Sequence, residues 1–212
     1  WAGPIAVATG AEYRREHYRV TGDPYGNGIF ADSPNTADYP ADPLLNTTVG
    51  NNWYAGNYHN AQGTYNVKEA YVELNVPVLK SATWGEANLN LADRHTKYST
   101  SGHVESWKVG ANWKTGLDGW RLRAVTSKDV RAPNLSELYA AQVVVNNVVA
   151  YQGNTIAIQQ RTVGNTNLRP EIARNTTAGI VLSQPSWAPG FSASIDYFDI
   201  KVKGVISALT DR

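Results

Sequence analysis

The side chains best suited to chemistry in this chain are its histidines, and their spacing does not build a metal site or a catalytic pair. They are His17, His59, His95 and His103, and none lies two or four residues from another. Metal ligands that share one element usually stand at such short spacings. Cysteine is absent, which excludes thiolate ligands, disulfides and a cysteine nucleophile. We therefore predict no metal site and no cofactor.

Other motifs that could carry chemistry are weak. The chain has no nucleophile elbow of the Gly-x-Ser-x-Gly type and no phosphate-cradling loop. Tyr25–Gly28 is glycine-rich, but Asn-Gly marks a turn and no helix follows. Asp32, Asp38 and Asp42 could attract calcium, although they lack the spacing of an EF-hand and we favour a solvated loop. We predict that the chain is not an enzyme. A barrel phospholipase stays an alternative that would need a Ser/His pair.

One segment is dense in aromatic side chains that could hold a small molecule. Trp53, Tyr54 and Tyr58 stand beside His59. Rings and an imidazole can stack on or ligate a cargo, so these four residues form the predicted ligand-binding surface of an outer loop. The alternative is a loop that packs on itself.

Strands must position these residues, because hydrophobic and polar residues alternate with period two along most of the chain. Before a Gly-rich turn at 115–119, the apolar positions of one strand share a face. They are Trp107, Val109, Ala111 and Trp113. We count about seven such strands, each near the ~9–11 residues of a tilted membrane-spanning strand.

The predicted connections alternate in length. The segments 18–66 and 130–173 are long, 99–105 is a medium loop, and 80–85, 115–119 and 185–190 are short turns. Long loops at one rim and short turns at the other are typical of bacterial outer-membrane barrels, whereas a soluble sandwich has no reason to sort them. Inside 130–173 we predict a turn or two of helix over Pro133–Tyr139, capped by Asn134 or Ser136. We also predict a hairpin that turns at Asn146-Asn147.

The side chains agree with a membrane-spanning sheet. Aromatic residues gather near the short turns and near the opposite strand ends, as two interfacial girdles would require. The polar faces include Glu69, Glu73, Arg121 and Arg123, which would be costly in a sandwich core and cheap in a wet or plugged lumen. We predict these four to face the lumen. The fold class is therefore all-β: an antiparallel up-and-down sheet forming part of a transmembrane β-barrel, with short periplasmic turns and long extracellular loops.

The net charge and the mean hydropathy are compatible with a membrane-spanning sheet, and the charge argues against a nucleic-acid-binding protein. Lys+Arg is 19 and Asp+Glu is 18, so no basic surface predicts a nucleic-acid partner. The mean hydropathy is −0.39, a value that alternating barrel strands can share with soluble proteins.

Several ordered blocks resemble the barrel of TonB-dependent outer-membrane receptors. Val67–Leu79 and Trp107–Trp113 look like strands of that family. The most specific block is Leu122–Ala124 leading to Asp129–Tyr139, in which Arg131, Pro133, Asn134 and Glu137 carry the family's motif at a strand–loop junction. Asn167–Glu171 and Ser194–Ile200 continue the match. A structural role in seating the outer loop, or a role in gating or cargo contact, would suit the motif residues.

The resemblance implies a 22-stranded barrel with a plug in its lumen. It implies uptake of a scarce ligand, such as ferric siderophore, haem, cobalamin or oligosaccharide, at the bacterial outer membrane. Residues 1–212 are then part of the barrel domain, and no plug, TonB-contacting segment or closing strand is recognisable in them. Expected partners are membrane lipid, the plug and remaining strands, TonB and the cargo. A soluble β-sandwich that binds carbohydrate is the alternative, and it would bury the Trp107–Trp113 face under a second sheet.

Overall fold

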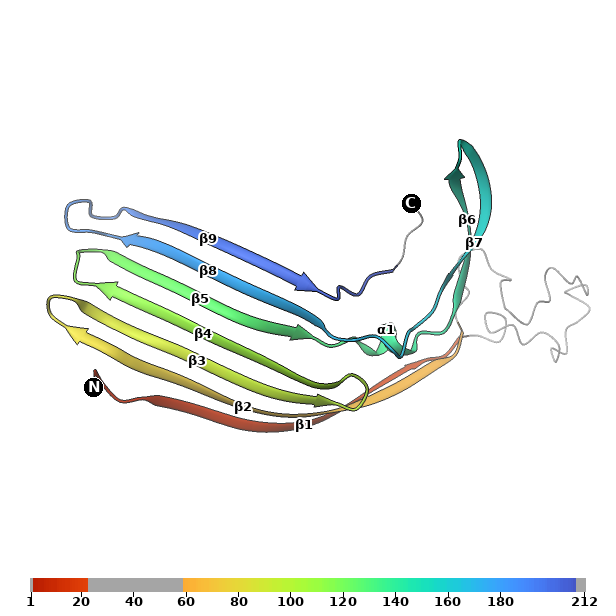
Figure 1. Cartoon of the computed structure of the whole chain (residues 1–212), viewed down its shortest axis with the longest axis horizontal. Coiled ribbons are helices and arrows are strands. Elements are labelled where there is room, and N and C mark those ends of the chain that lie inside the picture. Colours follow the sequence, from red (N-terminus) through yellow and green to blue (C-terminus); the bar gives the residue numbers. More distant parts are fainter. Residues whose placement is uncertain (1, 23–58, 209–212) are drawn as a thin grey trace, which may run out of the picture. The chain divides into compact units, whose positions relative to one another are not determined.

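The computed structural model describes residues 2–22 and 59–208, and most of them lie in strands (Figure 1). The strands are β1 (Ala6–Val20), β2 (Ala61–Ser81), β3 (Gly85–Tyr98), β4 (Gly102–Thr115), β5 (Trp120–Arg131), β6 (Val143–Tyr151), β7 (Asn154–Thr162), β8 (Glu171–Ser183) and β9 (Ser192–Lys203), and the helix is α1 (Leu135–Tyr139). No helix in the described part is long and apolar enough to cross a membrane.

The chain divides into two compact units. The first comprises residues 1–14, 66–132 and 169–205, and the second comprises 15–65, 133–168 and 206–212. The first holds most of one seven-stranded sheet in the order β1-β2-β3-β4-β5-β8-β9. Its neighbouring strands from β2 onward pair antiparallel and run side by side in a single layer (Figure 1). The predicted antiparallel up-and-down sheet of about seven strands is confirmed.

The register divides the sheet into two faces. Trp113 pairs with Leu122, Leu122 with Ile180, and Ile180 with Ile195, so these side chains share one face, called here the Trp113 face. One residue along, Arg123 pairs with Gly179 and lies on the opposite, Arg123 face. Within the described residues of the first unit no second sheet covers the Trp113 face, and Ile195 is 81% exposed. The β-sandwich alternative is therefore wrong.

Hydrophobic burial within the sheet is slight for its size. Over the whole described chain, the buried hydrophobic side chains are Tyr65, Val67, Leu135, Leu138 and Leu182, while many other large hydrophobic side chains are exposed. An exposed apolar area of this kind needs a partner other than water. The sheet is therefore held by its ladders of backbone hydrogen bonds and by cross-strand side-chain pairs.

Short turns close one end of the hairpins, as predicted. They span residues 82–84, 116–119 and 184–191. At the other end, β3 and β4 are joined by residues 99–101 alone, because Gly102 takes a φ of +77° and starts β4 there. The predicted medium loop over 99–105 is therefore too long.

The second unit contains α1 and a separate two-stranded sheet of β6 and β7. The predicted hairpin exists, but its predicted turn is wrong. Asn146 and Asn147 lie inside β6, and the turn falls at Gln152-Gly153, where φ is 49° and 81°. Two successive positive φ values are the requirement of a two-residue turn that matches strand twist. Gly153 supplies the second of them without strain.

Candidate functional site

The motif around Arg131 builds the junction at which β5 ends. Arg131 pairs with Glu171 across β5 and β8. Its Nε and Nη2 donate to the two carboxylate oxygens of Glu171 at 2.8 Å each. This fork holds a carboxylate whose side chain is only 14% exposed. Two parallel charge-assisted bonds fix both position and orientation, so the pair clamps the strand ends from which residues 132–170 depart.

The rest of the motif starts the helix. Pro133 is fully buried, and Asn134 is the N-cap. The Asn134 side chain accepts from the Glu137 amide at 2.8 Å, and the Glu137 carboxylate accepts from the Asn134 amide at 2.8 Å. This capping box satisfies two of the amides that a helix start leaves unpaired. The predicted helix and its Asn134 cap are confirmed.

The helix is then fastened within the second unit. Leu138 is 1% exposed. The amide of Gly164 donates to the Ala140 carbonyl at 2.9 Å, and that of Asn165 donates to the Glu137 carbonyl at 2.8 Å. These bonds join the two ends of the segment 137–165, so α1 anchors the base of the loop that contains β6 and β7. For the motif residues the visible contacts are structural.

Tyr139 adds a close contact with β2. A Cβ placed on Gly63 would lie 2.1 Å from Cδ2 of the Tyr139 ring. The Tyr139 hydroxyl lies 3.5 Å from the Thr64 carbonyl oxygen. Only a residue without a Cβ permits this approach. Gly63 and Thr64 of β2 therefore form the surface on which α1 packs, called here the seat of α1.

The Arg123 face carries charged side chains that pair across strands. Arg94 donates to Glu69 at 3.3 Å and lies 5.1 Å from the centroid of the Tyr71 ring. Thr96 also donates to Glu69, at 3.3 Å. A carboxylate with two donors, beside a cation that stacks on a ring, makes a polar surface with little side-chain freedom.

A second pair on this face bridges β5 and β9 across the intervening strand β8. Arg123 on β5 donates to Asp196 on β9 at 2.9 and 2.6 Å. Both hydrogen bonds cross above Gly179 of β8, where an added Cβ would lie 1.9 Å from Asp196 Oδ1. Because glycine has no side chain, Arg123 and Asp196 can meet at this position. The register places Glu69, Glu73 and Arg121 on the same face as Arg123.

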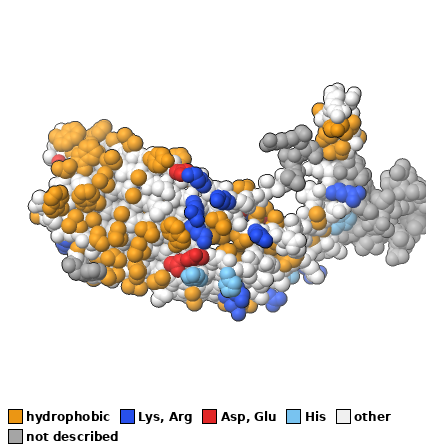
Figure 2. Space-filling view, viewed as in Figure 1, with side chains coloured by type: hydrophobic (Ala, Val, Ile, Leu, Met, Phe, Trp, Pro, Cys, Tyr) orange, Lys and Arg blue, Asp and Glu red, His pale blue; other side chains and the backbone are white. Residues whose placement is uncertain are grey.

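The Trp113 face changes character along the strands. Figure 2 shows hydrophobic side chains gathered over the half of the sheet near the short turns, with a band of charged and histidine side chains beside them. Near those turns the Trp113 indole donates to the Trp84 carbonyl at 2.8 Å. An apolar belt with amphipathic rings at its margin is what a lipid-facing surface requires.

The turns themselves are tied together. The Asp118 carboxylate, in the turn after β4, accepts hydrogen bonds from Ser186, in the turn after β8. The bonds from the Ser186 hydroxyl and then from its amide lower the pKa of Asp118 below the ordinary value of 3.8. A charged link therefore joins neighbouring turns.

Of the predicted ligand-binding surface, Trp53, Tyr54 and Tyr58 lie outside the described residues. His59 is described, is half-buried and precedes β2. The structure therefore does not test whether the four come together.

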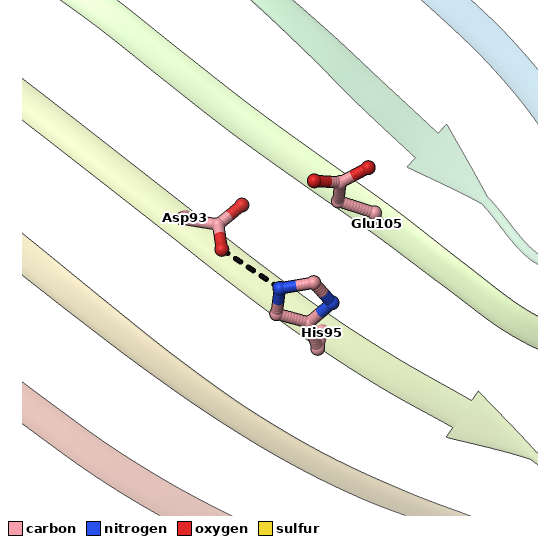
Figure 3. A group of neighbouring side chains, drawn as sticks. All are labelled: Asp93, His95 and Glu105. Carbon is pink, nitrogen blue, oxygen red and sulfur yellow. Dashed lines mark ion pairs between the residues drawn. The ribbon is translucent and has the colours of Figure 1, made fainter.

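The register assembles one cluster that the sequence did not reveal. Asp93, His95 and Glu105 offer donor atoms that all lie within 4.8 Å of one another (Figure 3). His95 Nε2 lies 2.9 Å from Asp93, and Glu105 comes from the neighbouring strand as the partner of His95. The sequence could have indicated only the Asp93-x-His95 pair, because these two residues lie on one strand. The set could hold one divalent cation, but Lys128 already lies 3.7 Å from Glu105.

The first unit is a single-layer sheet with a largely apolar Trp113 face and a polar Arg123 face. Comparison with known proteins identifies the family to which the chain belongs. A family model described as TonB dependent receptor-like, beta-barrel, matches residues 1–212. The chain belongs to this family. The predicted family is thereby confirmed, and the sheet is an arc of that barrel, which the described residues leave open between β1 and β9.

Two solved receptors share the fold of this family member. The siderophore receptor PirA from Acinetobacter baumannii superposes with a TM-score of 0.61 at 19% identity, over 94% of this chain and 24% of that one. A mutant of the ferric enterobactin receptor PfeA from Pseudomonas aeruginosa gives a TM-score of 0.60 at 17% identity, with the same coverage of 94% and 24%. The chain thus spans about a quarter of the length of these structures. No curated protein sequence matches it significantly.

Proposed function

We propose that this chain is a wall segment of an outer-membrane receptor that takes up a small-molecule cargo with energy delivered through TonB. The observation that carries the proposal is the single-layer sheet with an exposed apolar belt on its Trp113 face and paired charges on its Arg123 face. Family membership over residues 1–212 supports it. We propose a ferric siderophore as the cargo, since one structural neighbour is named a siderophore receptor and the other a ferric enterobactin receptor.

In this proposal the two faces of the sheet have different surroundings. The Trp113 face contacts membrane lipid, and the Arg123 face lines the lumen, where Glu69, Glu73, Arg121 and Arg123 contact water or the plug. The short turns are periplasmic, and the segment seated by α1 is extracellular. Trp53, Tyr54, Tyr58 and His59 remain the proposed cargo-contacting residues of an outer loop. TonB and the plug act through parts of the receptor outside this chain.

Uptake tests the function directly. The complete polypeptide is expressed in a Gram-negative strain that lacks its own siderophore receptors, and uptake of radioactive iron is measured with single ferric siderophores. We expect uptake of at least one of them, and none in a matched strain without TonB. Uptake that persists without TonB, or uptake of haem or cobalamin alone, would contradict the energy source or the cargo respectively.

Orientation is tested separately. This chain has no cysteine, so a substitution introduces a defined label within it. We expect Ser101→Cys, between β3 and β4, to react in intact cells with a membrane-impermeant maleimide. Leu117→Cys, in a short turn, should react only after the outer membrane is permeabilised. The opposite pattern would invert the proposed topology.

A further inference from the structure

Asp93, His95 and Glu105 stand on the Trp113 face, toward the ends of β3 and β4 that lie away from the short turns. His95 pairs directly with Glu105, and Asp93 lies two residues before His95 as the partner of Trp107. Residues two apart on a strand share a face, as do directly paired residues. Their donor atoms lie within 4.8 Å of one another and come from both strands of one hairpin (Figure 3). This trio is called here the rim cluster.

The distances in the rim cluster suit a metal ion of the size of zinc. Zinc holds nitrogen and oxygen ligands at about 2.0–2.2 Å, so neighbouring ligand atoms of a tetrahedral site lie about 3.4 Å apart. His95 Nε2 and Asp93 Oδ2 are already 2.9 Å apart. The side chains of His95 and Glu105 are 69% and 49% exposed, so they can turn by the remaining about 1.4 Å that a closed ligand set requires.

The types of ligand select the class of metal. An imidazole nitrogen suits zinc, copper and nickel, whereas calcium prefers six to eight oxygen ligands. Two carboxylates and one neutral imidazole carry a formal charge of −2, which one divalent ion offsets. Among residues 2–22 and 59–208, the rim cluster is the one group of three His, Asp or Glu side chains whose donor atoms come this close. Spacing along the chain predicted no metal site, because the third ligand comes from the neighbouring strand.

A lysine competes with the metal for one of these ligands. Lys128 Nζ lies 3.7 Å from the Glu105 carboxylate, which is longer than a charge-assisted hydrogen bond of about 2.7–2.9 Å. Exposed ion pairs contribute little to stability. Glu105 can therefore exchange Lys128 for a divalent ion, and the lysine then repels that ion.

The rim cluster lies where a charged site can stay in contact with water. The eight residues from Trp113 to Glu105 span about 26 Å along β4, or about 20 Å along the membrane normal at a tilt of about 40°. The apolar band of a barrel is about 25 Å tall. The cluster therefore stands at the margin of the apolar belt, next to Trp107. Carboxylates deeper in the belt would bear the cost of removal from water.

We propose that the rim cluster binds one divalent transition-metal ion, for which Zn²⁺ is the best match. Asp93 and Glu105 each supply a carboxylate oxygen and His95 supplies an imidazole nitrogen, while water completes the coordination. The metal clips β3 to β4 beside their connection at residues 99–101. The site is independent of the proposed cargo and of TonB.

Zinc binding is measured on the metal-free complete polypeptide in non-ionic detergent, by competition with a fluorescent zinc chelator. Removal of a residue that only orients a metal ligand typically costs about 10–100-fold in affinity, so His95→Gln and Glu105→Gln should each weaken one zinc equivalent at least tenfold. His17→Gln is the matched control, because it removes an exposed histidine of β1 outside the cluster. A tenfold excess of Ca²⁺ over Zn²⁺ should not displace the zinc.

The competing lysine supplies a variant with the opposite sign. Lys128→Gln removes a positive charge beside a ligand and should strengthen zinc binding about fivefold. A gain in affinity cannot come from a misfolded polypeptide, so this variant guards the losses seen in the others.

Hydrogen exchange places the metal on the hairpin. At a zinc concentration about a hundred times the dissociation constant, local opening of a bound site becomes about a hundredfold rarer. Exchange at residues 93–105 should slow accordingly, whereas exchange in β8 should not change. His95→Gln should abolish the zinc effect at 93–105.

Four results would overturn the proposal. They are zinc binding that survives both ligand variants, an equal loss in His17→Gln, weaker binding in Lys128→Gln, and displacement of zinc by calcium. Exchange that slows equally in β8 and at 93–105 would likewise exclude a local clip. Loss of siderophore uptake alone refutes the proposed transport and leaves the metal site standing.

Discussion

Because Gly63 contacts the Tyr139 ring, Gly63→Ala should destabilise the wild-type chain but stabilise a variant that lacks the ring. An alanine Cβ at position 63 would lie 2.1 Å from Cδ2 and 2.2 Å from Cγ of the Tyr139 ring. Ordinary contact begins at 3.4 Å, so the ring has to retreat by about 1.3 Å. Overpacking of this kind typically costs about 1–3 kcal/mol. Alanine is otherwise favoured over glycine in a strand by roughly 0.5–1 kcal/mol.

The two effects oppose each other, and the overpacking is the larger. Gly63→Ala should therefore destabilise the wild-type chain by up to about 2.5 kcal/mol. In a Tyr139→Ala background the obstacle is gone, and the same substitution should stabilise by roughly 0.5–1 kcal/mol. The coupling between the two sites is then about 1–3 kcal/mol.

The assay is a double-mutant cycle on the complete polypeptide folded into lipid vesicles. Hydrogen exchange at residues 135–139 reports the local opening free energy, and the guanidinium midpoint reports the global one. Tyr139→Phe is the matched control: it keeps the ring and removes only a hydroxyl that lies 3.5 Å from its acceptor, so it should change little. Additive effects of Gly63→Ala and Tyr139→Ala would refute the close-packed seat of α1.

Three further perturbations test other parts of the junction and the turns. Arg131→Lys keeps the charge but loses the fork to Glu171, so it should cost about 0.5–1 kcal/mol for this partly exposed pair and raise protease cleavage within 132–170; unchanged cleavage would contradict the clamp. Leu138→Ala removes a side chain that is 1% exposed and should cost about 2–5 kcal/mol, read as faster exchange of α1 with little change in β3 or β4. The lowered pKa of Asp118 stabilises the fold above its ordinary pKa, and this contribution is lost as the pH falls through the lowered value. Asp118→Asn should therefore be less stable than wild type at pH 7 and converge with it in acid, whereas a constant difference at all pH values would exclude the charged link to Ser186.

The sequence predicted the sheet well because period two is a local signal. Alternation at Trp107–Trp113 needs no knowledge of partners, and the register of β4 on β5 gives the faces that it indicates. The cap at Asn134 was readable for the same reason, since a capping box lies within four residues. Arg131 could be assigned to a junction from its motif, but its partner Glu171 is 40 residues away. Only the register of β5 on β8 brings them together.

The misplaced turns share a physical cause. Asn146-Asn147 carries a turn signal between valine runs, yet both residues adopt strand geometry because Gln152-Gly153 downstream provides two positive φ values. Gly102 likewise ends the turn earlier than its polar surroundings indicated. In each case a glycine decided the position. The cluster of Asp93, His95 and Glu105 escaped prediction because two strands contribute to it.

The edges of the sheet give a reason to expect further strands beside it. β1 and β9 stand at its two edges, and β9 carries an exposed ring on each face: Tyr197 and Phe198 are 65% and 68% exposed. An edge strand carries a row of unpaired amides and carbonyls, and each such group left unpaired in the hydrocarbon region costs several kcal/mol. A membrane-spanning sheet therefore has to close on itself. For this segment, closure requires strands that pair with β1 and β9, so the remaining barrel wall is a requirement of the chemistry of these edges as well as an expectation from the family.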